Sequence, residues 1–453
     1  MGEDRLEPLR QDPDLFVRIA ANAQVVAEEL RRDYFESTLG IAAAMREDFR
    51  SGENGYRIAP IPDGCTEPWA VAFVDGGLSR VDVGFDLALM VRAGIFRVKE
   101  GERDHAVRET FGHFPLFLGQ LRGGLKASSE YGNVVRHLVE LGALVTALED
   151  ERFADIKLLM LHGPLQFVSG PFFGHWFFEE DYLEMLGGPD RPHVQGLVHD
   201  FQGWCQRCPL ADSARCREDV ESKHLPAVCM MAYLQHRVFE SSSFRGVLLC
   251  GAIERPRGRS ITRHVVQRLL ATRPDLLDRL LDVLEIRERA TNTQVEAILD
   301  ATRYRDSTLL ALALDKGECI DWYPLERQHR PDDPRMQLFP RVQSAFLRVA
   351  AARYPMRIEA PMGLSADALS SIMCRSNDYA NLLPNYAFPI GLDIVDKYAA
   401  IPSWMSKAYK HLILAQYGRL LAGEYFDISD VTALKQMVLE GMEHDGRKRP
   451  EVE

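Results

Sequence analysis

Two short apolar segments, each followed at once by a polar side chain and glycine, constrain the fold of this chain most strongly. Residues 69–74 read Trp-Ala-Val-Ala-Phe-Val before Asp75, and residues 156–161 read Ile-Lys-Leu-Leu-Met-Leu before His162. Apolar runs of this length that end at glycine or proline are typical of buried strands. A helical periodicity is found between them, over residues 130–149. Buried strands separated by a helix predict an α/β fold with a mixed sheet.

The same patterns predict further elements. Helices are expected over residues 13–50, 261–284 with a break at Pro274, and 390–424. Strands are expected over residues 81–90, which would form a hairpin with the first strand, and 244–253. The chain should comprise an N-terminal helical region, a core in two parts, a cysteine-rich insertion between these parts, and a C-terminal helix with a charged tail. The N-terminal helical region is expected at residues 1–65 and the two core parts at residues 66–185 and 241–425. The cysteine-rich insertion is expected at residues 186–240, and the C-terminal helix with its tail at residues 426–453.

The charge balance narrows the functional classes. Lys+Arg number 54 and Asp+Glu 66, so the formal net charge is −12. This excludes a generally basic protein that coats nucleic acid, although a local basic groove stays possible. The first ten residues are charged and lack the apolar segment of a secretory signal. The longest uncharged run, residues 158–178, contains polar residues and prolines that a membrane-spanning helix tolerates poorly. We expect a soluble, cytoplasmic protein without membrane segments.

Three polar features stand where they could carry chemistry. Asp75 ends a buried strand and precedes two glycines, an arrangement suited to a cation and to the close approach of a phosphate, although Asp-Gly is also a common hairpin turn. His162 ends the second strand, where a hydrogen-bonded turn histidine is the alternative. Arg136 and Glu140 lie one helical turn apart, a spacing that also suits a surface ion pair.

Several short motifs, taken in order, resemble a known family. They are a strand before Asp-Gly, a helix with Arg-x-x-x-Glu, a strand before x-Gly-Pro-Leu, a strand with Gly-x-x-x-Arg, Arg-Ile-Glu-x-Pro, and an aromatic residue before Pro-x-x-Leu-x-x-x-Asp. This order is similar to that of the NurA nucleases, the DNA-end-processing partners of HerA-type hexameric translocases. The resemblance covers roughly residues 66–175 and 240–410.

The resemblance implies a ribonuclease-H-like α/β core, a mixed sheet flanked by helices. It also implies a nuclease dependent on manganese or magnesium that acts on DNA in end resection, repair or defence, as a homodimer docked on a HerA-type ATPase. Asp75 matches the first acidic metal ligand of the family. Glu140 matches the glutamate on the intervening helix, with Glu149 as the second choice.

The chain departs from the family at three positions. His162 stands where the family has aspartate, and Phe388 stands where a tyrosine is expected, with Tyr386 two residues earlier. Asp396 stands where the family often has histidine. Phosphodiester cleavage with two metal ions needs several hard oxygen ligands, so His162 weakens the site, but imidazole also binds manganese and Asp396 could return a carboxylate. A working nuclease and a catalytically degenerate scaffold that regulates the ATPase both remain open.

Arginines are the candidate DNA contacts. Arg255, Arg257 and Arg259 follow a predicted strand, and Arg357 opens the Arg-Ile-Glu-x-Pro motif. Short loops with guanidinium groups suit phosphate contacts. The alternatives are a solvated charged loop for the first three and a role in organising the core for Arg357.

Four cysteines suggest a second metal site. Cys205, Cys208, Cys216 and Cys229 form a Cys-x2-Cys-x7-Cys-x12-Cys pattern. Without a secretory signal, such a cluster favours metal over disulfides, and four thiolates can hold zinc or a [4Fe–4S] cluster. His224 could replace Cys229 as a zinc ligand, and buried inert thiols are the alternative to any metal. A redox or sensor protein built around this cluster is a third functional hypothesis.

Overall fold

The computed structural model describes residues 13–30, 35–52, 55–82, 87–121, 125–166, 177–179, 200–201, 203–204, 224–287, 291–302, 304–325, 338–349, 352–383 and 386–421. Within these residues the strands are β1 (Ile58–Pro60), β2 (Ala70–Asp82), β3 (Leu87–Lys99), β4 (Glu109–Leu121), β5 (Ile156–His162), β6 (Phe177–Glu179), β7 (His224–Pro226), β8 (Leu248–Ile253), β9 (Glu318–Pro324), β10 (Val342–Leu347) and β11 (Met356–Pro361).

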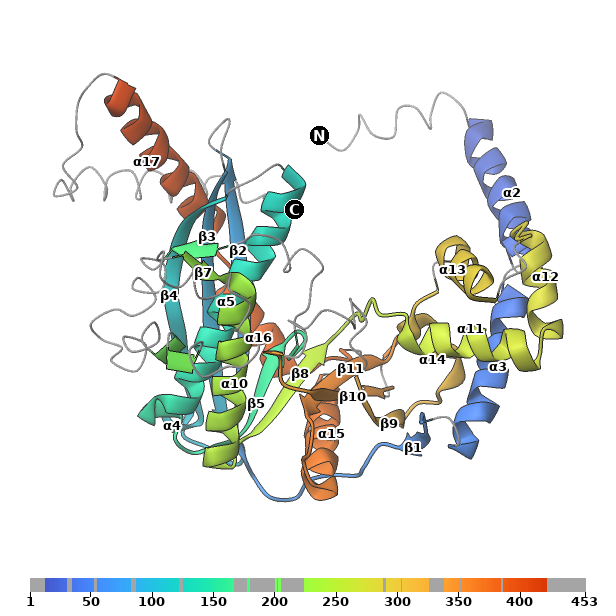
Figure 1. Cartoon of the computed structure of the whole chain (residues 1–453), viewed down its shortest axis with the longest axis horizontal. Helices are drawn as coiled ribbons and strands as arrows, with labels where there is room; N and C mark the ends of the chain where they lie inside the picture. The colour runs from blue at the N-terminus through green and yellow to red at the C-terminus, as the bar shows by residue number, and fades with distance from the viewer. Residues whose placement is uncertain are drawn as a thin grey trace. The chain divides into compact units, whose positions relative to one another are not determined.

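The helices within the same residues are α2 (Pro13–Leu30), α3 (Glu36–Ser51), α4 (His105–Arg108), α5 (Leu125–Glu149), α10 (Ala227–Arg245), α11 (Ser260–Thr272), α12 (Asp275–Val283), α13 (Thr291–Thr302), α14 (Asp306–Ala313), α15 (Ala366–Asn381), α16 (Ile390–Ala399) and α17 (Ser403–Leu421). Figure 1 shows their order along the chain. None of the helices described is both long and apolar enough to span a bilayer.

Nine strands form one mixed sheet in the order β1-β9-β10-β11-β8-β5-β2-β3-β4. Strands β2, β3 and β4 are successive antiparallel neighbours, whereas β2, β5 and β8 are parallel. Helix α5 connects the antiparallel strands to the parallel ones, as a parallel crossover requires. This arrangement confirms the α/β class and the ribonuclease-H-like mixed sheet. The order of the strands does not show the cysteine-rich insertion.

The chain divides into two compact units. The first contains residues 1–61, 254–323 and 346–357, and the second contains residues 62–253, 324–345 and 358–453. The candidate site below lies entirely within the second unit. The boundaries between these two units differ from the segment boundaries expected from the sequence. The expected segment boundaries stay a prediction.

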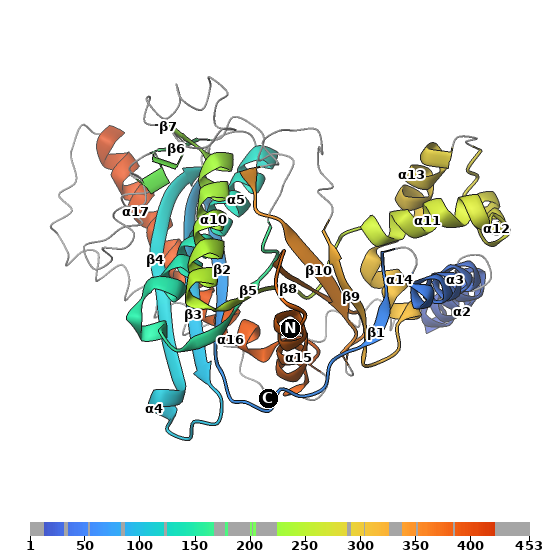
Figure 2. The ribbon, with the colours of Figure 1, turned by 60° about the horizontal axis from the view of Figure 1, so that its bottom comes forward.

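In the second unit, helices cover both faces of the antiparallel strands (Figure 2). Alternate residues of β2 point to opposite faces, as in any strand. Ala70, Ala72 and Val74 belong to one buried cluster with the apolar residues of α5 and α10. Phe73 points the other way and packs edge-on against Tyr379 of α15. Asp75 therefore lies on the face covered by α15 and α16.

Strand β2 does not end where the sequence predicts. It continues beyond Asp75 to Asp82, and its register with β3 is unbroken, with Asp75 opposite Gly94 and Gly76 opposite Ala93. The alternative of a turn at Asp-Gly is therefore wrong. A hairpin is present, but the strand expected over residues 81–90 comprises the end of β2, up to Asp82, and the start of β3, from Leu87. The two glycines allow close helix packing instead of a turn, because the Glu140 side chain approaches Gly76 from one face and the Ala399 backbone approaches Gly77 from the other.

Several other predicted elements are found, but the helix expected over residues 390–424 is divided at residues 400–402 into α16 and α17. The helix over residues 130–149 is confirmed within α5, and the strands over residues 156–161 and 244–253 correspond to β5 and β8. The break at Pro274 is confirmed, because α11 ends at Thr272 and α12 begins at Asp275. Strands β4 and β9 and helices α13, α14 and α15 are elements that the sequence patterns did not predict.

Candidate active site

The pairing of β2 with β5 brings the first two candidate residues together. The strands are parallel, and Val74 pairs with Leu161, so Asp75 and His162 are the next residues on each strand. They point to the same face of the sheet because side chains alternate with a period of two. The His162 Nδ1 atom lies 2.8 Å from Asp75 Oδ2. The end of β5 therefore holds an imidazole against the carboxylate of β2.

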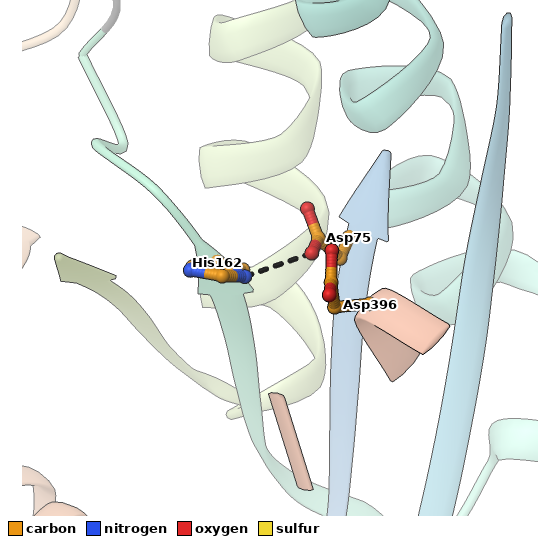
Figure 3. Close-up of side chains that lie close together, drawn as sticks. All are labelled: Asp75, His162 and Asp396. Carbon is orange, nitrogen blue, oxygen red and sulfur yellow. Dashed lines mark hydrogen bonds and ion pairs between the residues drawn. The ribbon is translucent and has the colours of Figure 1, made fainter. Parts of the chain in front are cut away.

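Helix α16 supplies the third member. Asp75, His162 and Asp396 each have one ligand atom within 4.8 Å of a ligand atom of the other two. Among the described residues, this is the one group of three acidic, histidine or cysteine side chains that lie so close together. Figure 3 shows the three side chains converging from two strands and one helix. Asp75 is buried and Asp396 is exposed. The cluster thus has one anchored carboxylate and one carboxylate open to solvent.

The two carboxylates in this cluster repel each other. Burial raises the pKa of Asp396, and so do the negative charge of Asp75 and a hydrogen bond with it, while His162 opposes the shift. Burial lowers the pKa of His162, but the hydrogen bond and charge of Asp75 and the charges of Asp396 and Glu140 outweigh it, so that pKa is raised. Two carboxylates and one imidazole that compete for positive charge are a donor set that fits a divalent cation.

Two aromatic residues border this cluster. The Phe388 ring lies 5.1 Å from the His162 ring, measured between centroids, and is buried. Phe388 therefore shields the imidazole from water, and it has no hydroxyl group to offer a substrate. The Tyr386 hydroxyl hydrogen-bonds to Asp393, whose pKa is lowered first by Lys397 and also by this bond. Tyr386 thus reaches the first turn of α16, where Asp393 also senses the charge of His162.

Glu140 lies beside the cluster but approaches from the other helix layer. A Cβ atom added to Gly76 would lie 2.5 Å from Glu140 Oε1, so the glycine makes room for this carboxylate. Glu140 is buried and pairs with Arg136 at 3.3 Å and with His137 at 3.1 Å. It is not one of the three residues whose ligand atoms converge, although its charge acts on His162.

Arg92 was not singled out from the sequence, yet it positions α16. Its Nε atom donates to the Ala399 carbonyl at 2.8 Å, and its Nη2 atom donates to the Tyr398 carbonyl at 2.7 Å and to that of Ala400. The last carbonyl groups of a helix lack partners within the helix, so a guanidinium is a strong cap. No local signal could reveal this cap, because Arg92 and α16 are about 300 residues apart along the chain.

Glu149 has a structural partner instead of a place in the cluster. Its carboxylate accepts two hydrogen bonds from Arg237 of α10, at 3.0 and 2.9 Å. Nine residues separate it from Glu140, which is about 13 Å along a helix. Glu140 is therefore the one of these two acids that approaches Gly76 beside Asp75, and its part in the site stays a prediction.

We expect Glu149→Gln to lower the free energy of unfolding by about 1–3 kcal/mol, because it weakens a half-buried, two-point ion pair. Manganese affinity should not change. Thermal melting and calorimetric titration with manganese measure the two effects. Asp200→Asn is the matched control, since Asp200 also pairs with Arg237 but is more exposed. Weaker manganese binding by the Glu149 variant would contradict this assignment.

The arginine candidates belong to the first unit. Arg255 and Arg257 are exposed, whereas Arg259 pairs with Asp300 at 3.2 Å. Arg357 and the buried Asp306 both approach Gly258, since a Cβ added to it would lie 3.4 Å from Arg357 Nη1 and 3.2 Å from Asp306 Oδ2.

Asp306 and its partners connect this loop to two helices. Burial raises the pKa of Asp306, opposed by hydrogen bonds from Thr262 and by the charge of Arg357. This geometry supports a core-organising role for Arg357.

Of the clustered cysteines, Cys229 lies within the described residues and the other three, Cys205, Cys208 and Cys216, lie outside them. Cys229 is fully buried in α10 and is not disulfide-bonded. His224 lies in β7. The structure therefore provides no support for zinc or an iron–sulfur cluster.

The isolated cysteines pack in the interior as expected in three of four cases. Cys250, Cys319 and Cys374 are buried, and burial is the main cause that raises each thiol pKa to about 12. Cys65 is half-buried. Thiols with so high a pKa are unreactive at neutral pH.

Solved structures with a similar chain path include nucleases. No protein-family model and no curated protein matches this chain. The NurA nuclease from Sulfolobus solfataricus is 12% identical, and the match covers 90% of this chain and 98% of that one with a TM-score of 0.49. A NurA structure bound to dAMP and manganese is 9% identical over 86% of this chain and 94% of its own, with a TM-score of 0.36.

An endonuclease V from Ciona intestinalis in complex with DNA is also similar. It is 9% identical, and the match covers 79% of this chain and 93% of that one, with a TM-score of 0.27. The resemblance to NurA nucleases that the sequence predicts is thus found again among solved structures. At these identities the likeness concerns the path of the chain, and the function proposed below rests on the side chains of this protein.

Proposed function

We propose that this protein is a metal-dependent nuclease of NurA type that hydrolyses DNA phosphodiesters. The observation that carries the proposal is the convergence of Asp75, His162 and Asp396 within 4.8 Å at the end of β5. Such a donor set suits manganese, and magnesium less well, because one of its three ligands is an imidazole. The sequence resemblance to the NurA family supports DNA as the substrate.

Each residue has a role in this proposal. Asp75, His162 and Asp396 would hold the cation. A bound cation would polarise the scissile phosphate and lower the pKa of a coordinated water. Asp75 also orients the His162 ring, and Phe388 packs against that ring. Glu140 is an additional carboxylate close to the cluster and Tyr386 fixes the start of α16 through Asp393; we propose that both support the site.

The direct test is cleavage of linear DNA in the presence of manganese, with and without a chelator. We expect cleavage that requires the metal and that magnesium supports less well. A His162→Ala variant should retain the fold but lose most of the activity, because one of three ligands is removed. Absence of cleavage under all metal conditions would overturn the nuclease proposal.

His162→Asp should raise magnesium affinity by about tenfold, because a carboxylate replaces an imidazole as the ligand of a hard cation. Calorimetric titration with magnesium and manganese measures this change. His105→Asp is the control, since His105 is exposed in α4 and remote in sequence from the cluster. A magnesium affinity that stays constant or falls would show that His162 does not face the cation.

A catalytically degenerate scaffold that regulates the ATPase is the second candidate. This candidate is supported by the hydrogen bonds of Asp75. Its carboxylate accepts a hydrogen bond from the Gly76 amide and shares another with His162, so it has partners without a metal. The two candidates differ in metal binding. A protein that binds the ATPase but takes up no manganese would favour the scaffold.

We also propose that the loop with Arg255, Arg257 and Arg259 contacts DNA phosphates. Replacing Arg255 and Arg257 by glutamine should reduce the slope of log affinity against log salt by about 1 for each phosphate ion pair that the substitution removes. Binding of labelled DNA at several salt concentrations measures the slope. Arg263→Gln, an exposed arginine of α11 that pairs with Glu296, is the matched control. An unchanged slope in the double variant would exclude the loop from the interface.

Partners are proposed on the sequence resemblance. A HerA-type hexameric ATPase and a second copy of this chain are the expected partners, with a role in DNA end resection, repair or defence. The exposed apolar side chains of α2, among them Val17, Ile19 and Val25, support contact with another protein chain. Light scattering of the protein with and without the cognate ATPase tests both interactions.

The zinc or [4Fe–4S] site at the cysteines is a further proposal, which metal analysis of the purified protein tests.

A further inference from the structure

Two exposed aromatic side chains form a pair on the surface of the second unit. The Phe111 ring of β4 and the Tyr398 ring of α16 lie 5.1 Å apart at an interplanar angle of 53°. Phe111 is 41% exposed and Tyr398 is 37% exposed. Behind them, Phe96 stacks on Phe111 at 4.8 Å and on Phe73 at 6.0 Å. The pair is therefore the solvent end of an aromatic row that is anchored in the core and held rigid.

Tyr398 of this pair lies one strand away from Asp75. A Cβ added to Gly94 would be 2.8 Å from Tyr398 Cδ1, so the Tyr398 ring covers Gly94. Gly94 is the residue of β3 directly opposite Asp75 in the register. Adjacent strands are about 5 Å apart, so the tyrosine ring covers the strand beside the one that carries the central carboxylate.

The charge near the pair is suited to a phosphate backbone. Arg152 is exposed, and its pKa is raised by the hydrogen bond with Asp150, by the charge of Asp150 and by Tyr398. This guanidinium lies over the Phe153 ring, 5.5 Å from its centroid, and Phe153 approaches Gly112, the neighbour of Phe111 on β4. Exposed aromatic rings beside cations are the usual means by which proteins bind single-stranded nucleic acid, since bases stack on the rings and phosphates meet the cations.

We propose that Phe111 and Tyr398 form a stacking platform for an unpaired base of the DNA strand that enters the site. The proposal rests on the proposed nuclease function, and it specifies the strand form that the site accepts. A base in a duplex is stacked on its neighbours and cannot use the platform. A single-stranded end can place a base on the rings while its phosphate reaches a cation held by Asp75, His162 and Asp396.

The test is the affinity for a short fluorescein-labelled oligothymidine, measured by anisotropy in a chelator so that no cleavage occurs. The double variant Phe111→Leu/Tyr398→Leu should bind the single strand roughly tenfold more weakly than the unaltered protein. Affinity for a duplex of the same length should change by less than about twofold. Phe244→Leu is the matched control, since Phe244 is 93% exposed in the same unit but lies on α10.

Further measurements distinguish a folding defect from a missing platform. Tyr398→Phe keeps the ring and should bind the single strand like the unaltered protein. The double variant should still unfold in one cooperative transition, at a lower temperature than the Phe244→Leu control because Phe111 also stacks on Phe96, and its unchanged duplex affinity shows that it is folded. If the unaltered protein binds the single strand no more tightly than the double variant, the proposal of a stacking platform is wrong.

The failure of this inference differs from the failure of the nuclease function. If the protein binds oligothymidine through the two rings but cleaves no DNA with any metal, the platform stands and the nuclease proposal fails. If the protein cleaves DNA and the double variant binds and cleaves single strands normally, the nuclease proposal stands and the platform is wrong.

Discussion

Asp75→Asn should reduce DNA cleavage by at least about 100-fold and abolish manganese binding at the cluster. Asp75 shares a hydrogen bond with His162, has a ligand atom within 4.8 Å of one of Asp396, and is the buried member of the three. Asparagine has the same shape but no negative charge, so the site would hold one carboxylate and one imidazole. Calorimetric titration with manganese and single-turnover cleavage of linear DNA measure the two losses.

The Asp75 prediction needs a control for the general loss of an acid. Asp367→Asn changes an exposed carboxylate in the first turn of α15 and should alter neither metal affinity nor cleavage. The melting temperature of the Asp75 variant should stay constant or rise, because the repulsion between two carboxylates is removed. An Asp75 variant that binds manganese with normal affinity would place the catalytic cation elsewhere.

Gly77→Ala should have the second-largest effect, through the position of α16. A Cβ atom at Gly77 would overlap the backbone carbonyl of Ala399, which cannot move away as a flexible side chain could. The C-terminal end of α16 would be displaced from β2, and Asp396 lies one turn earlier on that helix. We expect a loss of about 1–3 kcal/mol in the free energy of unfolding, as for other overpacked positions.

The same substitution should weaken manganese binding, since Asp396 would move away from Asp75 and His162. Thermal melting and manganese titration measure the two effects on one preparation. Gly64→Ala is the matched control, because a Cβ at Gly64 meets nothing within 4 Å. If Gly77→Ala melts and binds manganese like the Gly64 variant, α16 does not pack on β2 as described.

The sequence predicted the parts of the fold that depend on local patterns. Strand β5, helix α5 and the helix break at Pro274 follow from apolar periodicity and from the geometry of proline. Asp75 and His162 were predicted as site residues because each follows an apolar run. Once β2 and β5 are parallel neighbours in this register, both residues necessarily meet.

Other features could not be read locally. Asp75-Gly76 has the composition of a turn, but thirteen backbone pairs between β2 and β3 continue the strand through it. The glycines at this point reflect the approach of Glu140 from one face and of Ala399 from the other. A short sequence window contains neither neighbour, so it favours the turn that the same residues form elsewhere.

The amino-acid sequence by itself determined the α/β class, the main strands and helices, and the two polar residues that end the apolar runs. Only the tertiary structure decided that Asp396 completes the group of three, that Glu140 stands beside it and that Glu149 pairs with Arg237. It alone also brought Phe111 next to Tyr398. The physical reason is that apolar periodicity acts within one element, whereas strand register and helix packing join segments hundreds of residues apart.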